Sequence, residues 1–352
     1  MGVALVTGSS GLIGSQAVES LVSGGFRVVG IDNDLRSYFF GLESSTAWNR
    51  ERLLNKFPKT FESHALDIRD YAALESIFNK QSFDLIIHAA AQPSHDWAAK
   101  EPLVDFSVNA NGTLNLLELS RKFSPNANFV LLSTNKVYGD KPNSLPLIEF
   151  SHRWDLPEGS PYFNGIDESF SIDDSLHSLF GASKLSADIM VQEYGRYFGI
   201  NTLILRGGCL TGPMHSSSQL HGFLSHLVKS YVKGNRYTIF GYKGKQVRDN
   251  IHAKDVVDLI LRFHSNPHPA LVLNLGGGRD NSVSILEAID KLQELGGGRK
   301  LDFVYEDVAR MGDHIWYVSN LSKVKSFYPG WKLTYGIDDL IDEMYEVASR
   351  ST

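Results

Sequence analysis

Short apolar runs alternate with amphipathic stretches along the first part of the chain. The runs are typical of buried parallel strands and cover residues 3–7, 27–31, 61–66, 85–88, 129–132 and 202–205. Between them, apolar positions recur at helical spacing, first at Ile13, Ala17 and Leu21 and later over residues 104–123 and 176–198. This alternation predicts an α/β fold, a Rossmann-type doubly wound parallel sheet with helices on both faces.

The pattern changes after Arg206, where glycines separate shorter elements. We therefore expect residues 1–206 to form the sheet domain, with returns of the chain near residues 249–262 and 271–275. Residues 207–352 are then expected mainly to form a smaller C-terminal lobe that binds the substrate. A long connection over residues 140–175 is rich in proline, aromatic and acidic residues, and its length favours a functional role.

A glycine-rich turn joins the first strand to the first helix. Gly8, Gly11 and Gly14 have the spacing GxxGxxG, which lets a backbone turn tightly and approach a pyrophosphate at a helix N-terminus. The second strand ends at Asp32, whose carboxylate can accept hydrogen bonds from ribose hydroxyls. This order of elements predicts a dinucleotide-binding domain. The carboxylate repels a 2′-phosphate and favours NAD, while Arg36 leaves NADP as a minor alternative.

The composition narrows the class of protein. The 352 residues carry 34 basic and 40 acidic side chains, a net charge of −6, so no overall positive field favours nucleic acid. A hydrophobic content of 42% excludes disorder as the main organisation. The single cysteine excludes an intrachain disulfide, and no histidine spacing is typical of a metal site. Without a membrane-spanning run or signal peptide, we expect a soluble cytoplasmic protein with no metal.

Several motifs together resemble one family. With the glycine turn and Asp32, the pair Ser133-Thr134, Lys184 and the stretch 247–249 resemble the extended short-chain dehydrogenase/reductase family, and within it the nucleotide-sugar epimerases and dehydratases. The resemblance covers essentially the whole chain. Residues 133–140, 164–169 and 244–249 are similar to the CDP-paratose (CDP-tyvelose) 2-epimerase branch.

The resemblance implies a reaction and a set of partners. Enzyme-held NAD takes hydride from a sugar carbon while a base takes the hydroxyl proton, and the hydride returns to the opposite face of the keto-sugar. The implied substrate is a nucleotide-diphosphate sugar, with CDP favoured and UDP or GDP as alternatives. The family also implies a homodimer that pairs through the helices expected at residues 104–123 and 176–198.

The resemblance assigns site residues. Thr134 would polarise the reacting oxygen, and Lys184 would hold the nicotinamide ribose and lower the pKa of the base. The residues expected to bind the cofactor are Gly8, Ser10, Gly11, Leu12, Ile13, Gly14, Asp32, Asn33, Asp67, Ile68, Ala89, Ala90, Ala91, Asn109, Ser133 and Lys184. The residues expected to bind the substrate are His95, Asp96, Thr134, Asn135, Lys136, Gln219, His221, Gln246, Arg248, Arg310 and Asp313.

The chain departs from the family at its catalytic tyrosine. The family pattern is Tyr-x-x-x-Lys, and this chain has Phe180 four residues before Lys184. Phenylalanine carries no exchangeable proton. Three explanations stay open: a deliberate Tyr-to-Phe variant, a natural branch with another base, and a protein that binds without turnover. We favour the natural branch, with His177 as the first candidate base. The further candidates are Tyr138, His95 and Asp96.

A second departure concerns the two residues after Thr134. The family's sugar 4,6-dehydratases carry an Asp-Glu pair there for the elimination of water, and this chain has Asn135-Lys136. The change argues for an epimerase. A 4-epimerase, an unusual dehydratase and a catalytically impaired binding protein are the alternatives.

Overall fold

The computed structural model describes residues 1–216, 222–309 and 312–350. The chain divides into two compact units. The first comprises Met1–Val137, Leu179–Arg206 and Val256–Leu273. The second comprises Tyr138–Ser178, Gly207–Asp255 and Asn274–Thr352. This division differs from the expected one, because residues 138–178 lie in the second unit and the return to the first unit begins at Val256.

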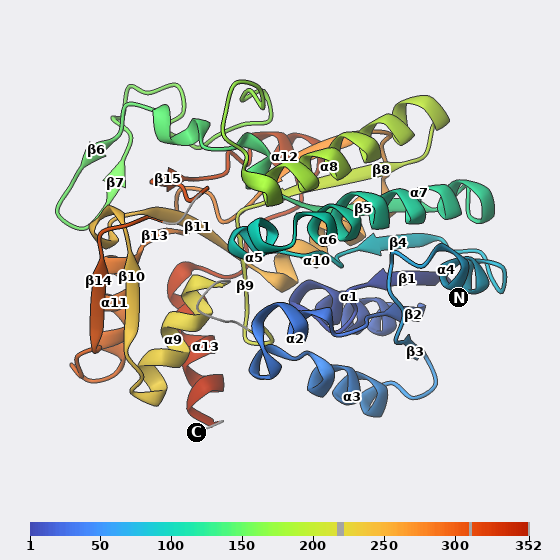
Figure 1. Ribbon diagram of the computed structural model, residues 1–352, viewed down its shortest axis with the longest axis horizontal. Coiled ribbons are helices and arrows are strands. Elements are labelled where there is room, and N and C mark those ends of the chain that lie inside the picture. The colour runs from blue at the N-terminus through green and yellow to red at the C-terminus, as the bar shows by residue number, and fades with distance from the viewer. Residues whose placement is uncertain (217–221, 310–311, 351–352) are drawn as a thin grey trace. The chain divides into compact units, whose positions relative to one another are not determined.

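The first unit contains the large sheet and most of the helices of the chain (Figure 1). Its strands are β1 (Val3–Thr7), β2 (Arg27–Ile31), β3 (Phe61–His64), β4 (Leu85–His88), β5 (Asn128–Thr134), β8 (Thr202–Gly207) and β12 (Leu271–Leu275). Its helices are α1 (Leu12–Ser23), α2 (Leu35–Phe40), α3 (Ala47–Lys56), α4 (Tyr71–Phe78), α5 (His95–Lys100), α6 (Pro102–Phe106), α7 (Gly112–Phe123), α8 (Ser178–Phe198) and α10 (Ala253–Ser265). A few residues at the ends of β8, β12, α8 and α10 belong to the second unit.

The seven strands form one sheet in the order β12-β8-β5-β4-β1-β2-β3, and the pairings from β5 through β3 are parallel. Helices α7 and α8 cover one face, and α1 and α3 cover the other (Figure 1). The chain order reverses between β1 and β4, and ligands of such sheets bind outside the carboxyl ends of the strands at this point. The predicted Rossmann-type fold is confirmed.

Two predicted helices differ from those in the structure. The stretch 104–123 is broken into α6, a π-helical turn over Ser107–Asn111, and α7. The turn places Asn109 in the interior, where its amide hydrogen-bonds to Gln92 and Ser183. The helix predicted from residue 176 begins at Ser178, whose φ of 60° lies in the left-handed region. His177 therefore precedes α8 and is not part of the helix that carries Phe180.

The second unit contains smaller sheets packed with helices. Its strands are β6 (Ile148–Glu149), β7 (Trp154–Asp155), β9 (Cys209–Thr211), β10 (Tyr237–Phe240), β11 (Val247–His252), β13 (Ser282–Ser284), β14 (Phe303–Glu306) and β15 (Trp316–Tyr317). Its helices are α9 (Phe223–Lys233), α11 (Ile285–Leu295), α12 (Ser322–Phe327) and α13 (Ile337–Arg350). Strand β11 pairs with β9, β13 and β15, and β10 pairs with β14. An apolar core joins α9, α11 and α13.

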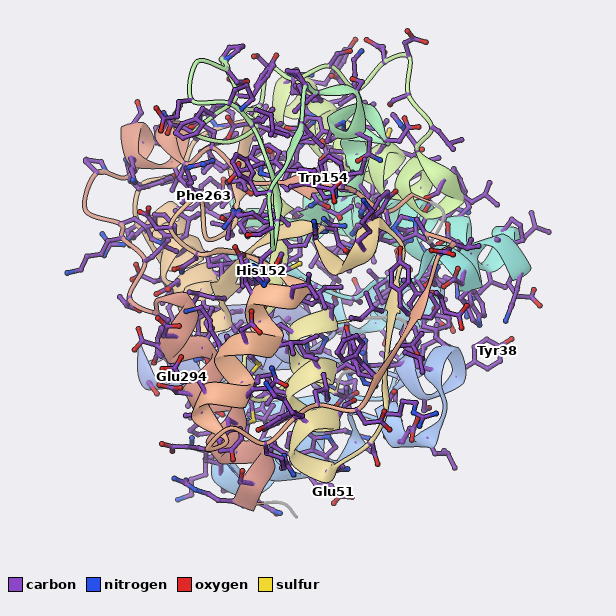
Figure 2. All side chains as sticks on the ribbon, turned by 90° about the vertical axis from the view of Figure 1, so that its left-hand side faces the viewer. Tyr38, Glu51, His152, Trp154, Phe263 and Glu294 are labelled. Carbon is purple, nitrogen blue, oxygen red and sulfur yellow. The ribbon has the colours of Figure 1, made fainter. Side chains whose placement is uncertain are left out.

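Hydrogen bonds explain why the long connection belongs to the second unit. His152 and Trp154 lie on its β6–β7 hairpin (Figure 2). The backbone N–H of Trp154 donates to the carbonyl of Lys245 at 2.9 Å, and the Ser284 hydroxyl donates to the carbonyl of His152 at 2.6 Å. Arg279 donates to both oxygens of Asp155, each at 3.0 Å. These long-range bonds attach residues 138–178 to β13 and to the segments just before β11 and β13.

Candidate functional site

The glycine turn leaves no room for side chains. Gly8 has a φ of 67°, and a Cβ on Gly14 would lie 1.9 Å from the carbonyl oxygen of Gly8. The N-cap residue of α1, Gly11, makes no side-chain cap, so the first N–H groups of this twelve-residue helix are available to an anion. Ser10, Leu12 and Ile13 occupy the same strand-to-helix turn. The bare backbone and the uncapped helix fit a pyrophosphate.

The carboxylate of Asp32 is oriented by the backbone around it. Oδ2 accepts from the N–H of Ser10 and Oδ1 accepts from the N–H of Asp34, both at 2.9 Å. Burial raises the pKa of Asp32 above its usual value, and these two hydrogen bonds oppose that effect. The carboxylate thus lies beside the glycine turn, as a ribose ligand requires.

A second carboxylate, that of Asp67, follows the next strand of the sheet, β3. Asn33 donates to Asp67 at 3.0 Å, and Arg69 binds the same carboxylate. Ile68 differs from its neighbours, because its side chain packs in the core and its carbonyl accepts from Asn115. Its predicted cofactor contact could therefore come only from the backbone.

Three alanines follow β4 at the reversal of the sheet. Ala89, Ala90 and Ala91 are half-buried. The N–H groups of Ala89 and Ala90 donate to the carbonyl and hydroxyl of Thr7, at 3.1 and 3.3 Å. The backbone of this strip is therefore held against the end of β1, next to the glycine turn, and its small side chains permit a ligand to approach.

Lys184 lies buried at the end of β5. Its Nζ donates to the carbonyl of Leu132 at 2.8 Å. Burial lowers its pKa to about 8, while the charges of Asp188 and Asp105 oppose that shift. Thr134, the last residue of β5, is half-buried, and its Oγ1 accepts from the N–H of Lys136 at 3.2 Å. The structure thus places Thr134 at the end of the strand whose Leu132 carbonyl accepts from the ammonium group of Lys184.

A buried polar network behind Lys184 was missed by the sequence analysis. Asp188 accepts from the hydroxyl of Ser133 at 2.7 Å, from Gln192 at 2.8 Å and from the guanidinium of Arg206. Ser133 is thus engaged within the protein through its side chain. The available signal was the spacing of Asp188, four residues after Lys184 on the same helix, together with an arginine at the end of β8.

A second missed network joins the loop after β4 to α8. Asn109 accepts from the N–H of Gln92 at 2.9 Å and donates to the hydroxyl of Ser183 at 3.0 Å. Gln92 in turn donates to Asp105 at 2.6 Å. Asn109 is 1% exposed, so its side chain supports the site and does not line it. The cofactor contact predicted for Asn109 stays a prediction.

Phe180 lies one helical turn before Lys184 and is 6% exposed. The imidazole of His95, the first residue of α5, packs edge-on against its ring, with centroids 4.9 Å apart and planes at 73°. Asp96 follows on α5 and is half-buried. The ring of Trp97 packs against that of Phe39, with centroids 4.5 Å apart.

The other candidate bases have different surroundings in the second unit. The hydroxyl of Tyr138 donates to Asn274 at 2.8 Å, and the side chain is fully buried. His177 has its Nδ1 within 3.1 Å of the hydroxyl of Ser175. Burial lowers the pKa of His177, against the opposing charge of Asp140.

The predicted nucleotide-binding residues of the second unit lie around the start of β11. Arg248 is 9% exposed, and its guanidinium donates to the carboxylate of Asp313 and to the carbonyls of Val247 and His314. Gln246 donates to the carbonyl of Phe240 at 3.0 Å. Within the part of the chain that the structure describes, its Oε1 is buried and has no hydrogen-bond partner. The predicted residues Gln219, His221 and Arg310 lie outside the described residues.

Among residues 1–216, 222–309 and 312–350, no helix is both long enough and apolar enough to cross a bilayer. In the same ranges, no three or more His, Cys, Asp or Glu side chains gather as a metal site would require.

Comparisons with known proteins agree with this geometry. The model of the NAD dependent epimerase/dehydratase family matches residues 4–276. CDP-paratose 2-epimerase from Salmonella typhi is 30% identical, over 98% of each chain. Human UDP-glucose 4-epimerase is also 30% identical, over 97% of this chain and 94% of its own.

A solved structure has a similar fold. It is a tyrosine-to-phenylalanine mutant of UDP-glucuronic acid 4-epimerase from Bacillus cereus, in complex with UDP-4-deoxy-4-fluoro-glucuronic acid and NAD. It superposes with a TM-score of 0.80 at 23% identity and covers 99% of this chain and 100% of its own.

Proposed function

Because the chain belongs to the NAD-dependent epimerase/dehydratase family, and is therefore an NAD-dependent enzyme of nucleotide-diphosphate sugars, we propose that it epimerises a CDP-linked sugar at carbon 2. One observation carries the choice of epimerisation over elimination. Thr134 is followed by an amide and an ammonium group, Asn135 and Lys136, where a 4,6-dehydratase needs two carboxyl groups. The choice of CDP and carbon 2 is supported by the full-length relative from Salmonella typhi.

The cofactor is NAD, which supplies reversible hydride acceptance when bound. The glycine turn and the N-terminus of α1 hold the pyrophosphate, and Asp32 accepts from the ribose hydroxyls. Thr134 donates its Oγ1 proton in a hydrogen bond to the reacting sugar oxygen. Lys184 donates to the nicotinamide ribose, and its positive charge favours loss of the sugar hydroxyl proton.

In the second unit, Arg248 and Asp313 hold the nucleotide. The guanidinium is nearly buried, so an exchange of Asp313 for a diphosphate would keep its charge compensated. Gln246 supplies a buried acceptor without a partner among the described residues, and such an oxygen favours a ligand group that donates a hydrogen bond. An amino group of a nucleobase or a ribose hydroxyl has this character.

We also propose that the chain forms a homodimer through α6, α7 and α8. Large apolar side chains on these helices are exposed, as a surface that pairs with a second copy would be. They are Leu103, Phe106 and Leu114 on the first two helices and Leu179, Ile189, Tyr197 and Phe198 on α8. Light scattering of the purified protein should give twice the chain mass, and the mass of a single chain would contradict the dimer.

Proton NMR in deuterated water, with NAD and a panel of CDP-, UDP- and GDP-sugars, tests the function. A new sugar spin system without accumulated NADH is expected for a CDP-sugar, and the changed couplings identify the carbon. Change at carbon 4 would instead support the second candidate, a 4-epimerase, which the equal identity to the human enzyme favours. Binding of NAD and a nucleotide sugar without turnover would favour the remaining alternative, a catalytically impaired binding protein.

A further inference from the structure

The reaction needs a group that takes a proton from the sugar hydroxyl, and position 180 cannot provide it. Phe180 is buried one turn before Lys184, so the segment has the position of the family's tyrosine without its hydroxyl. Lys184 already donates to the carbonyl of Leu132 and is a cation below its pKa of about 8. It favours loss of the proton by its charge but is not itself a ready acceptor at neutral pH.

One titratable side chain lies directly against the ring at position 180. The imidazole of His95 contacts Phe180 edge-on at a centroid distance of 4.9 Å. Both residues belong to the first unit, together with Thr134 and Lys184. Imidazole is the side chain that enzymes use most often for general acid–base catalysis.

The contact between His95 and Phe180 is supported by buried hydrogen bonds. Ser94 caps α5 by accepting from the N–H of Trp97 at 3.2 Å, which holds the first turn that carries His95. Gln92 donates to the carbonyl of Ser94 at 2.9 Å. Through Asn109, the backbone of Gln92 is joined to Ser183, the residue directly before Lys184. The loop before α5 and the catalytic segment of α8 are therefore linked by a chain of hydrogen bonds.

Other histidines and the buried tyrosine are less suited to this role. His88 lies between the hydroxyls of Thr7 and Thr113, and burial lowers its pKa to about 3. The hydroxyl of Tyr138 donates to Asn274 in the interior of the second unit. His177 precedes α8 and lies in the second unit, where its Nδ1 is beside Ser175.

We propose that His95 is the acid–base catalytic residue of this enzyme, in place of the tyrosine missing at position 180; the proposal rests on the proposed epimerase function. An imidazole nitrogen of His95 takes the hydroxyl proton as the C–H hydride leaves for bound NAD and the C–O bond becomes a carbonyl. In the return step the carbon regains the hydride on its opposite face and the oxygen regains the proton from His95. Protons and electrons balance over the cycle.

The test compares His95→Asn, His95→Gln, Phe180→Tyr and the double variant Phe180→Tyr/His95→Asn, with His152→Asn, at an exposed histidine of the second unit, as the control. Loss of a general base lowers kcat about 10²–10⁴-fold. We expect this loss for both His95 variants, with NAD affinity within about threefold of the wild type by calorimetry.

The kcat of the double variant should be at least about tenfold higher than that of His95→Asn, because a tyrosine hydroxyl again reaches the site. A merely structural role of His95 would not be rescued by Phe180→Tyr. His152→Asn should change kcat less than threefold.

A second measurement does not depend on the folding of the variants. In wild-type protein labelled with ¹⁵N-histidine, the ring of His95 is assigned by its nuclear Overhauser contact with Phe180. Addition of NADH and the nucleotide sugar should move its ring ¹⁵N resonances and leave those of His177 in place. Unmoved His95 resonances overturn the proposal.

Two outcomes separate this proposal from the proposed function. If the wild type is inert and Phe180→Tyr converts the sugar, the role of His95 is refuted and the epimerase function stands. If the wild type and Phe180→Tyr are both inert with every sugar, the epimerase function and the role of His95 are both refuted. An active His95→Asn variant, with kcat within threefold of the wild type, overturns the role of His95 alone.

Discussion

The guanidinium of Arg206 donates to both carboxylate oxygens of Asp188, at 3.1 and 3.0 Å, and both side chains are buried. The hydroxyl of Ser133 donates to the same carboxylate. The pair thus connects the ends of β5 and β8 with the helix that carries Lys184. Removal of one partner leaves the other charge buried without compensation.

We expect Asp188→Ala to lower the free energy of unfolding by about 3–5 kcal/mol. Urea denaturation followed by circular dichroism measures the change. The matched control is Asp258→Ala, because Asp258 pairs with Arg262 on the exposed surface of α10, and such pairs contribute less than about 1 kcal/mol. Equal losses for the two variants would contradict the special role of the buried pair.

Gly14→Ala should abolish NAD binding without unfolding the protein. The new Cβ would lie 1.9 Å from the carbonyl oxygen of Gly8, so the turn must move away from the position that receives the pyrophosphate. Calorimetry with NAD measures the loss, expected to exceed about 100-fold in Kd. Gly159→Ala is the control, because a Cβ at that position meets nothing within 4 Å. Unchanged NAD affinity of Gly14→Ala would refute this interpretation of the turn.

Asp249 should make stability depend on pH. Burial raises its pKa from 3.8 to about 6, although the N–H groups of Ser319 and Gly278 donate to its carboxylate. Since the folded pKa exceeds the unfolded one, the contribution is full below pH 4 and is lost as the pH rises through 6. Relative to Asp249→Asn, the wild type should lose about 2–3 kcal/mol between pH 4 and 7.5.

Urea denaturation of both proteins at several pH values measures this difference. The comparison cancels the titration of other groups, since the asparagine keeps an acceptor for the same N–H donors. A difference between the two proteins that stays constant from pH 4 to 7.5 would exclude Asp249 as the source.

Thr134→Val should lower kcat about 10–100-fold, the effect of losing one hydrogen bond to an oxygen that gains charge in the transition state. Thr134→Ser keeps the hydroxyl and should stay within a few-fold of the wild type. Calorimetry should find NAD binding unchanged in both, because the effect lies in the chemical step. Steady-state kinetics with the identified nucleotide sugar makes the measurement, and equal rates for the valine and serine variants would rule out the hydroxyl.

Local patterns were sufficient for much of the fold. The strands at residues 27–31 and 85–88 have their predicted bounds in the structure, and the glycine turn joins β1 to α1 as expected. These features follow from forces between neighbours in the chain: a run of apolar side chains suits a buried strand, and a residue without Cβ suits a crowded turn. The Rossmann-type order of elements and the family resemblance rest on the same short-range signals.

Other features depend on contacts between residues far apart in the chain. The left-handed backbone at Ser178 starts α8 after His177, and hydrogen bonds to β13 and to Lys245 draw residues 138–178 into the second unit. Neither effect changes the local apolar pattern. The pairing of Asp188 with Arg206 and the contact of His95 with Phe180 likewise arise only when the sheet brings their elements together. The sequence by itself thus determines which residue types are available, including the phenylalanine at position 180. Burial and packing in the tertiary structure determine which titratable groups lie next to that position.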